Sequence, residues 1–172
     1  VSAGQVNWCE DVRRWHPGQR WLWQAGGLGV FDPGINAFSI LTTILPLAPR
    51  VDSATLEVPA NAHTPIAARL ALAAGDARID VPLDFLQSGP QLWEIVLDTA
   101  CGHRLQLSEG GARLALDAGP ARGGDSAEYP ALYAHFARLL AAGASDVDAA
   151  PFALAIDALA RGTVRRAPAF IE

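Results

Sequence analysis

Residues 26–41, which read GGLGVFDPGINAFSIL, decide how this sequence folds. Glycine occupies three of the first four positions, which indicates a loop. The apolar residues Ile35, Phe38 and Leu41 follow at helical spacing and share a face that can pack inward. Asp32 and Asn36 are four positions apart and share a different face. The stretch therefore predicts a loop that enters a buried helix, whose first turn presents a carboxylate and an amide to a cleft.

Asp32 has two interpretations from the sequence. An Asp-Pro pair is typical of a helix start, because the carboxylate accepts hydrogen bonds from free N–H groups and proline fits the first turn. In that case Asn36 is a solvated or hydrogen-bonded helix residue. Alternatively, both side chains serve chemistry in the cleft. Pro46 ends the expected helix, which runs over about residues 32–45.

The composition is that of one globular domain. The 172 residues can bury a core, and 51% hydrophobic against 18% charged residues excludes a disordered chain. A formal net charge of -5 argues against nucleic-acid and anionic-membrane partners. No apolar run approaches the ~20 residues of a membrane span, and the first residues resemble no signal peptide. We therefore expect a cytoplasmic protein with reduced thiols at Cys9 and Cys101.

Alternating apolar residues predict short strands separated by turns, followed by two helices with apolar stripes. The expected strands cover residues 4–12, 53–58, 66–72, 79–85, 93–97, 105–107 and 114–116, with a last edge strand over 163–167. The first helix carries the stripe Leu132, Tyr133, Phe136, Leu139 and Leu140, and the second lies before Gly162. The sequence therefore predicts an α+β fold: an open-faced, largely antiparallel sheet of about six to eight strands with helices packed on one face.

The sheet face opposite the helices is expected to be half apolar. It carries Ala67, Ala71, Leu86, Leu92 and Val96 among polar residues. A half-apolar open face is a candidate interface between two copies of one chain, so we expect a homodimer.

Aromatic residues gather on loop-like sequence near the N-terminus. Trp15, Trp21 and Trp23 lie close to His16, and such rings suit the apolar face of a sugar or a flat cofactor. The alternative is that the tryptophans cap one end of the core. Glu10 and His16 could bind hydroxyl groups, or they could form a local salt bridge that closes the turn.

Several kinds of site are excluded by the sequence. The glycine-rich stretch lacks the Lys-Ser/Thr of a phosphate-binding loop and follows no strand of a βαβ unit. No His-x-x-x-His or Cys-x-x-Cys pair indicates a metal site, and no serine lies in a nucleophile elbow. All 13 Lys and Arg residues are arginine, so no lysine can form a Schiff base.

Residues 26–36 resemble the Gly-Gly-Gly-x-x-x-Asp-x-Gly-x-His signature of the Gfo/Idh/MocA oxidoreductases, with Asn36 at the histidine position. Residues 10–19, which read EDVRRWHPGQ, make the chain similar to the members of that family that oxidise aldoses such as galactose and arabinose at C1. The likeness covers nearly the whole chain, including residues 107–114 and 128–133. It is therefore a resemblance of the entire domain and not of one motif.

The resemblance implies that the complete enzyme has two domains, one for the cofactor and one for the sugar. In this family an N-terminal Rossmann half binds NAD or NADP and carries a catalytic lysine, and a C-terminal α+β half holds the sugar. Residues 1–172 resemble only the second half, as one substrate-binding and dimerisation domain, which agrees with the absence of lysine. The fragment is then expected to be inactive alone.

The resemblance also implies roles for individual residues. Asp32 and Asn36 are the expected catalytic residues, and Glu10, Trp15, His16 and Trp93 the expected sugar-binding residues. A carboxylate can take the proton of the C1 hydroxyl as the aldose becomes a lactone, and an amide can orient a hydroxyl. The asparagine at position 36 argues against the His–Asp relay of the signature and places more of the chemistry on Asp32 and the missing lysine.

Two other functions remain open from the sequence. One is a non-catalytic sugar-binding or oligomerisation module that has no cofactor domain. The other is an oxidoreductase of the same family that acts on another polyol or on a biliverdin-like substrate.

Overall fold

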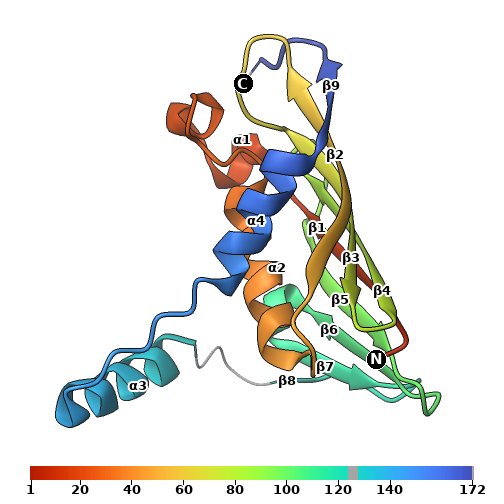
Figure 1. The fold of residues 1–172 in the computed structure, drawn as a ribbon, viewed down its shortest axis with the longest axis vertical. Helices are drawn as coiled ribbons and strands as arrows, with labels where there is room; N and C mark the ends of the chain where they lie inside the picture. Colours follow the sequence, from red (N-terminus) through yellow and green to blue (C-terminus); the bar gives the residue numbers. More distant parts are fainter. Residues whose placement is uncertain (124–127, 172) are drawn as a thin grey trace.

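A computed structural model describes residues 1–123 and 128–171 and contains one nine-stranded sheet with helices (Figure 1). The strands are β1 (Ala3–Cys9), β2 (Arg50–Pro59), β3 (Ala67–Ala74), β4 (Ala77–Asp84), β5 (Leu92–Asp98), β6 (Arg104–Ser108), β7 (Arg113–Leu116), β8 (Arg122–Gly123) and β9 (Thr163–Ala167). The α-helices are α1 (Val12–Trp15), α2 (Phe31–Ile44), α3 (Glu128–Ala142) and α4 (Ala150–Arg161), and the 3-10 turns are η1 (Arg20–Trp23) and η2 (Glu109–Gly111). The α+β prediction is confirmed.

The sheet is mostly antiparallel, in the order β8-β7-β6-β5-β1-β4-β3-β2-β9. Parallel pairing occurs between β1 and β4 and between β2 and β9. Strand β1 therefore lies in the middle of the sheet, between two groups of strands that are each consecutive in the sequence (Figure 1).

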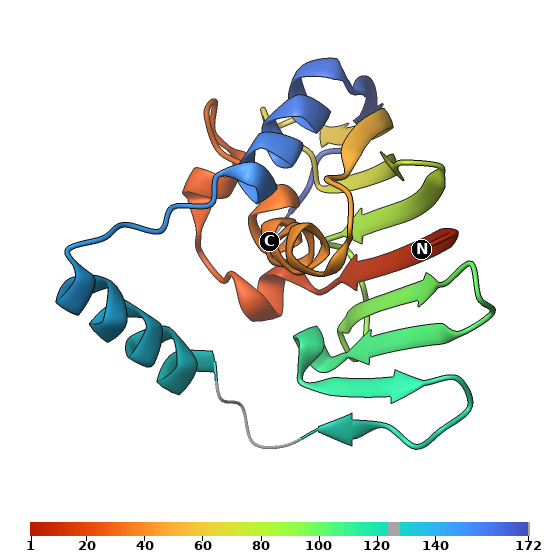
Figure 2. The same ribbon diagram turned by 60° about the horizontal axis from the view of Figure 1, so that its bottom comes forward.

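The core lies between one face of the sheet and helices α2 and α4, which pack against each other (Figure 2). Phe38 and Leu41 of α2 are fully buried, as are Ala155 and Ala158 of α4. Helix α2 approaches β4 closely at Gly34, where a Cβ atom would lie 2.9 Å from Leu83 Cδ1. The predicted inward face of α2 is thus confirmed for Phe38 and Leu41, whereas Ile35, the third residue of that prediction, is only half-buried. The buried face holds the first turn of the helix against the centre of the sheet.

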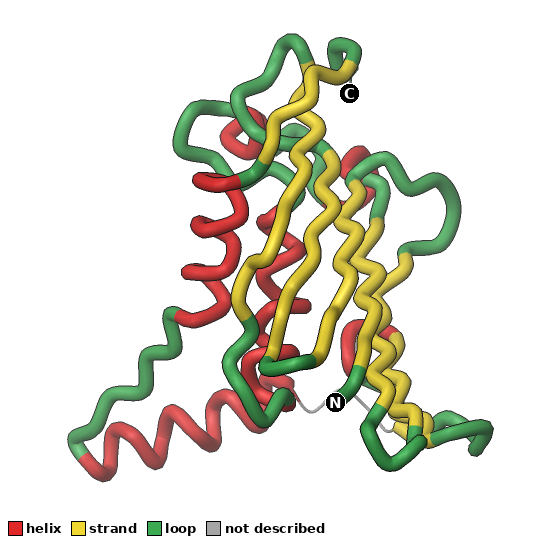
Figure 3. Tube along the Cα trace, turned by 45° about the vertical axis from the view of Figure 1, so that its right-hand side comes forward, coloured by secondary structure: helices red, strands yellow, loops and turns green. Residues whose placement is uncertain are grey.

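The other face of the sheet is covered by no helix among the described residues (Figure 3). Arg69 and Asp80 are exposed on it, whereas Ala71 between them is buried. Val96 is half-buried there, and Leu92 keeps 46% of its surface exposed. The face therefore mixes apolar and charged side chains, as the alternation predicts.

Helix α3 departs from the expected packing. The sequence predicts that its apolar stripe packs on the sheet, but no residue of α3 is buried, and the helix stands apart from the sheet (Figures 1 and 2). Tyr133 and Leu140 are 64% and 66% exposed. The helix-to-sheet packing is instead made by α2 on β1 and by α4 on β2. This part of the prediction is wrong.

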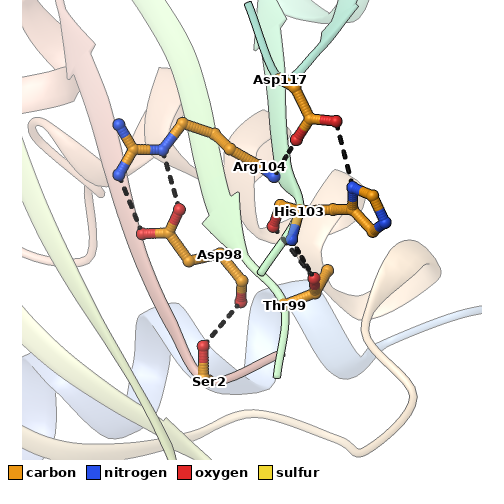
Figure 4. A network of polar contacts seen from close by, with 6 residues as sticks. All are labelled: Ser2, Asp98, Thr99, His103, Arg104 and Asp117. Carbon is orange, nitrogen blue, oxygen red and sulfur yellow. Dashed lines mark hydrogen bonds and ion pairs between the residues drawn. The ribbon is translucent and has the colours of Figure 1, made fainter. Parts of the chain in front are cut away.

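A network of polar contacts fixes the turn between β5 and β6 at one end of the sheet (Figure 4). The Arg104 guanidinium donates to both carboxylate oxygens of Asp98, at 2.7 and 3.1 Å. The Asp117 carboxylate accepts from the Arg104 backbone N–H and pairs with His103 Nδ1 at 3.0 Å. These groups are exposed, so their pairing orders the turn more than it stabilises the fold.

Two further observations concern the cysteines and the membrane. Cys9 is buried and Cys101 is exposed, and both are free thiols, as predicted. None of the helices within residues 1–123 and 128–171 combines the length and the apolar character that a membrane span requires.

Candidate active site

A cleft of about 1110 Å³ opens beside the first turns of α2. It lies between α2, the segment that follows β1, the indole of Trp93 on β5 and the η2 turn. The residues that line it are Trp8, Glu10, Trp15, His16, Asp32, Pro33, Ile35, Asn36, Ser39, Ile40, Trp93, Leu107, Glu109, Gly110, Gly111, Ala112 and Glu128. They include all six expected site residues, which are Glu10, Trp15, His16, Asp32, Asn36 and Trp93.

The segment after β1 is held by short-range contacts. Strand β1 ends at Cys9, so Glu10 follows directly from the centre of the sheet. The Asp11 carboxylate then caps α1, because its Oδ1 accepts the Arg13 backbone N–H at 3.0 Å. Helix α1 is a single turn that ends with Trp15 and leaves His16 at its C-cap. The strand and the capped turn together place Glu10, Trp15 and His16 on one wall of the cleft.

Glu10 is the most buried charged side chain of this wall, with 2% of its surface exposed. Its Oε1 lies 2.8 Å from His16 Nε2, and its Oε2 accepts the indole N–H of Trp93 at 2.8 Å. Both carboxylate oxygens therefore have a polar partner within the protein. The Glu10–His16 pair that the sequence left as an alternative is present, and it is buried rather than exposed at the surface.

Asp32 does not cap α2. The helix begins at Phe31, its N-cap is Val30, and no side chain makes a capping hydrogen bond there. Backbone carbonyls accept from the first N–H groups instead: Pro65 O from Val30 at 2.8 Å, and Gly29 O from Asp32 at 3.0 Å. The capping interpretation of Asp32 is therefore wrong, because main-chain acceptors already satisfy these groups.

The Asp32 carboxylate instead points toward His16. Its Oδ2 lies 3.8 Å from His16 Nδ1, and the side chain is 28% exposed. Burial raises the pKa of Asp32 above its ordinary value, and the nearby His16 opposes this rise. A carboxylate with a raised pKa is a stronger base than an exposed one, which suits proton abstraction.

Asn36 lies one turn further along α2, on the same face as Asp32. Among the described residues its side-chain amide makes no hydrogen bond, so both its donor and its acceptor are available to a ligand in the cleft. The expected arrangement of a carboxylate and an amide on one face of the helix is thus present.

The tryptophans divide into two groups. Trp8 stacks on Trp93 with ring centroids 6.1 Å apart, and Trp15 tilts against Trp93 at 4.8 Å. Trp15 is 38% exposed and offers a ring to the cleft. Trp23 instead packs against the rings of Phe85 and Phe170, outside the cleft. Capping of the core therefore describes Trp23, whereas Trp15 and Trp93 face the candidate ligand.

The sequence analysis missed the wall formed by η2. Glu109 adopts φ 53° although it is not glycine, and Gly110 and Gly111 follow with φ 69° and 97°. The two glycines lie close to other walls of the cleft. A Cβ atom on Gly110 would lie 3.7 Å from the Trp93 ring, and one on Gly111 would lie 3.5 Å from Ile40 Cδ1 of α2. Left-handed backbone at a non-glycine residue is often found at functional sites. The available signal was the Ser-Glu-Gly-Gly run at residues 108–111, which the sequence alone indicates only as a turn.

Comparison with known proteins finds relatives that align with the whole of this chain. No family model matches the sequence. A galactose 1-dehydrogenase from Pseudomonas fluorescens is 45% identical over 175 residues, which cover all of this chain and 56% of that protein. The chain is a homologue of galactose 1-dehydrogenase. The homology confirms the resemblance on which the sequence analysis relied, and the chain spans about half the length of this relative.

Solved structures agree with the galactose dehydrogenase homology. A D-galactose-1-dehydrogenase protein from Rhizobium etli is 46% identical, with a TM-score of 0.88 over 99% of this chain and 55% of its own. A 3-ketoreductase from Actinomadura kijaniata, at 10% identity and a TM-score of 0.71, shares the fold. So does an oxidoreductase from Agrobacterium radiobacter in complex with NAD+, L-tartaric acid and magnesium, at 19% identity and a TM-score of 0.64.

The start of α2 is not suited to a pyrophosphate. Helix N-termini bind such anions through free N–H groups, but those at the start of α2 are bonded to backbone carbonyls, and Asp32 places a negative charge beside them. The described parts of the chain also contain no group of three His, Cys, Asp or Glu residues that could hold a metal ion.

Proposed function

We propose that this chain is the substrate-binding, C-terminal half of an NAD(P)-dependent aldose 1-dehydrogenase that converts galactose or arabinose to its lactone. The observation that carries the proposal is the cleft in which Asp32 and Asn36 face the indoles of Trp15 and Trp93. Homology to galactose 1-dehydrogenase over the whole chain supports the same assignment.

The residues of the cleft have complementary roles in this reaction. Oxidation at C1 removes a hydride and the proton of the C1 hydroxyl, and a nicotinamide held by another domain supplies the hydride acceptor. Asp32 accepts the hydroxyl proton, which its raised pKa favours. Asn36 orients that hydroxyl or a neighbouring one through its amide. Trp15 and Trp93 contact the apolar face of the sugar ring and exclude water from it.

The cofactor, NAD or NADP, belongs to a Rossmann half outside residues 1–172, together with the lysine that the family uses in catalysis. This chain contains no lysine, and the first N–H groups of α2 are already bonded to backbone carbonyls and not free for a pyrophosphate. Residues 1–172 then form one domain for substrate binding and dimerisation, and we propose that this domain is inactive alone.

We also propose that two copies of the chain pair through the sheet face that no helix covers. Ala67, Ala71 and Val96 provide small apolar contacts on this face, and Arg69 and Asp80 can form charge pairs across a two-fold axis. A homodimer of this kind would leave the cleft accessible, because residues of α2, on the helix-covered side of the sheet, line the cleft.

Sugar binding by the chain alone is the direct test of the site. Galactose and arabinose should quench the tryptophan fluorescence of the chain in a saturable manner, because Trp15 and Trp93 line the cleft. Asn36→Ala should weaken this binding, whereas the matched control Asn7→Ala, on the outer face of β1, should not. Absence of saturable quenching by any aldose would contradict the proposal.

The nucleotide sequence upstream of the Val1 codon distinguishes the proposed dehydrogenase from a non-catalytic sugar-binding module. A reading frame that encodes a strand, Gly-x-Gly-x-x-Gly and a helix supports the dehydrogenase. A frame without these features supports a non-catalytic sugar-binding module. Turnover of galactose or arabinose by a protein that contains both halves completes the test.

A further inference from the structure

Three side chains of the cleft form a continuous line from the buried core to the helix face. The Glu10 carboxylate pairs with His16 Nε2 at 2.8 Å, and His16 Nδ1 faces the Asp32 carboxylate at 3.8 Å. On its other side, Glu10 is fixed by the Trp93 indole N–H at 2.8 Å. The histidine thus lies between two carboxylates, one of them buried and the other beside the open cleft.

The Trp93 contact has a consequence for the protonation of His16. An indole N–H only donates and an ionised carboxylate only accepts, so Glu10 is held as an acceptor. His16 Nε2 must then supply the proton of the Glu10–His16 contact. In a neutral imidazole this leaves Nδ1 without a proton and directed at Asp32. The side-chain oxygen of Gln19 lies 3.4 Å from Nδ1, and a 180° flip of this amide presents its nitrogen to the same lone pair instead.

We propose that His16 relays the proton that Asp32 takes from the sugar, and that Glu10 is the positioning residue that keeps His16 in the tautomer able to receive it. The inference rests on the proposed dehydrogenase function. The sequence analysis expects Glu10 and His16 to bind sugar hydroxyls and finds no relay at position 36, where the family signature has histidine. The geometry points to a relay that enters the cleft from α1 instead.

The proton and electron balance of the relay is complete. The C1–H bond breaks as a hydride leaves for the nicotinamide, and the C1 hydroxyl proton passes to an Asp32 oxygen as the C=O bond of the lactone forms. Asp32 then transfers this proton to His16 Nδ1 and returns to its ionised form. The resulting imidazolium is stabilised by Glu10, and His16, whose side chain is 16% exposed, releases the proton to water. No other oxidant or reductant is required.

Glu10 and Asp32 are the charged groups that face His16 from the elements packed around it. Glu10 follows β1 and Asp32 lies on α2, and the uncharged neighbours are the Gln19 amide at 3.4 Å and the ring of Phe85, after β4, at 5.3 Å. Arg13 and Arg14 of α1 are exposed and interact with Asp11 and Phe170 or with Trp15. Among the described residues, the charged groups that His16 contacts are therefore two carboxylates.

Long-range ¹H–¹⁵N NMR of the labelled chain tests the tautomer without any turnover. We expect neutral His16 to carry its proton on Nε2, and Asp32→Asn to change the Nδ1 shift without changing the tautomer. Glu10→Gln should give a mixture of tautomers, because an amide can accept or donate. Asp11→Asn is the matched control: it changes a neighbouring carboxylate that caps α1, and asparagine caps equally well.

A proton on Nδ1 in the wild-type chain would overturn the relay, and so would an unchanged tautomer in Glu10→Gln. If Glu10→Gln does not fold, the wild-type tautomer and the response to Asp32→Asn still decide the question. These measurements succeed or fail whether or not the protein oxidises a sugar. Failure of the proposed function is seen separately, as an absence of aldose oxidation by the wild-type two-half protein.

Kinetics of that two-half protein separate positioning from sugar binding. Loss of a residue that orients a reacting group typically reduces activity about 10- to 100-fold. We expect Glu10→Gln to lower kcat in that range and to leave KM nearly unchanged. A raised KM with unchanged kcat would identify Glu10 as a sugar ligand and would overturn its positioning role. Asp11→Asn should leave both parameters unchanged.

Discussion

Replacement of Asp32 by asparagine should separate catalysis from stability. The substitution keeps the shape of the side chain and removes its charge and basicity. It breaks no capping hydrogen bond, because the first N–H groups of α2 are bonded to backbone carbonyls. The loss that remains is the attraction between a negative charge and the helix N-terminus, about 0.3–1 kcal/mol.

The raised pKa of Asp32 acts in the opposite direction. Burial raises this pKa above its ordinary value of 3.8, and His16 only partly opposes the effect. A group with a higher pKa in the folded than in the unfolded state reduces stability once it is ionised. This reduction is absent below the unfolded pKa and is fully present above the folded pKa. Asp32→Asn removes it at neutral pH, so we expect the melting temperature to fall by no more than about 3 °C, or to rise.

The expected effect on catalysis is much larger. A general base typically contributes 100- to 10,000-fold to the rate, or about 2.7–5.4 kcal/mol. The assay measures kcat and the melting temperature of the two-half protein, with Asp11→Asn as the control that changes a carboxylate of similar exposure outside the cleft. More than about a third of wild-type kcat in Asp32→Asn would refute the assignment of Asp32 as the base. As the pH falls below about 4, the stability of the two proteins should converge.

Three other predictions follow from the same geometry. The chain alone should form no NADH from galactose or arabinose and NAD+, since hydride transfer requires a positioned cofactor; detectable turnover would contradict the two-half assignment. Analytical ultracentrifugation should show a dimer at tens of micromolar, as expected for an interface of roughly 1,600 Å², and a monomer would contradict pairing through the open sheet face. Gly29→Ala should lower the free energy of unfolding in urea by more than about 2 kcal/mol, because a Cβ at φ +55° would lie 2.2 Å from Pro65 O. Gly18→Ala is the control, because a Cβ at φ +70° would have no atom within 4 Å there. It should lower the free energy of unfolding by only about 1 kcal/mol, the cost of the left-handed backbone for alanine.

The sequence was most informative where local pattern and tertiary packing agree. The apolar spacing of α2 places Asp32 and Asn36 correctly, because a helix that buries Phe38 and Leu41 must present the opposite face elsewhere. The alternating apolar residues likewise predict the sheet. Nine strands form rather than the expected six to eight, because the two-residue strand β8 adds one more strand at an edge of the sheet.

Other features depend on contacts that the sequence does not encode locally. Glu10 reads as a surface carboxylate, yet pairing with His16 and with Trp93, 83 positions away, makes its burial possible. The wall formed by Glu109–Gly111 reaches the cleft only because β6 and β7 lie in the same sheet as β1. The apolar side chains of α3 recur at the spacing of a buried helix, but this spacing does not show which surface they pack against.

The central position of β1 determines the order in which the molecule can assemble. Strands β2, β3 and β4 pair as neighbours in the sequence, as do β5, β6 and β7, so each group can form through short turns. Strand β1 pairs with β4 and β5, and its Ala3 meets Arg78 and Asp98, so it closes long loops and should dock late in folding. Until it docks, β4 and β5 each expose an unpaired edge that invites association with other chains. Because Glu10 follows β1 directly, the candidate site is among the last parts of the protein to form.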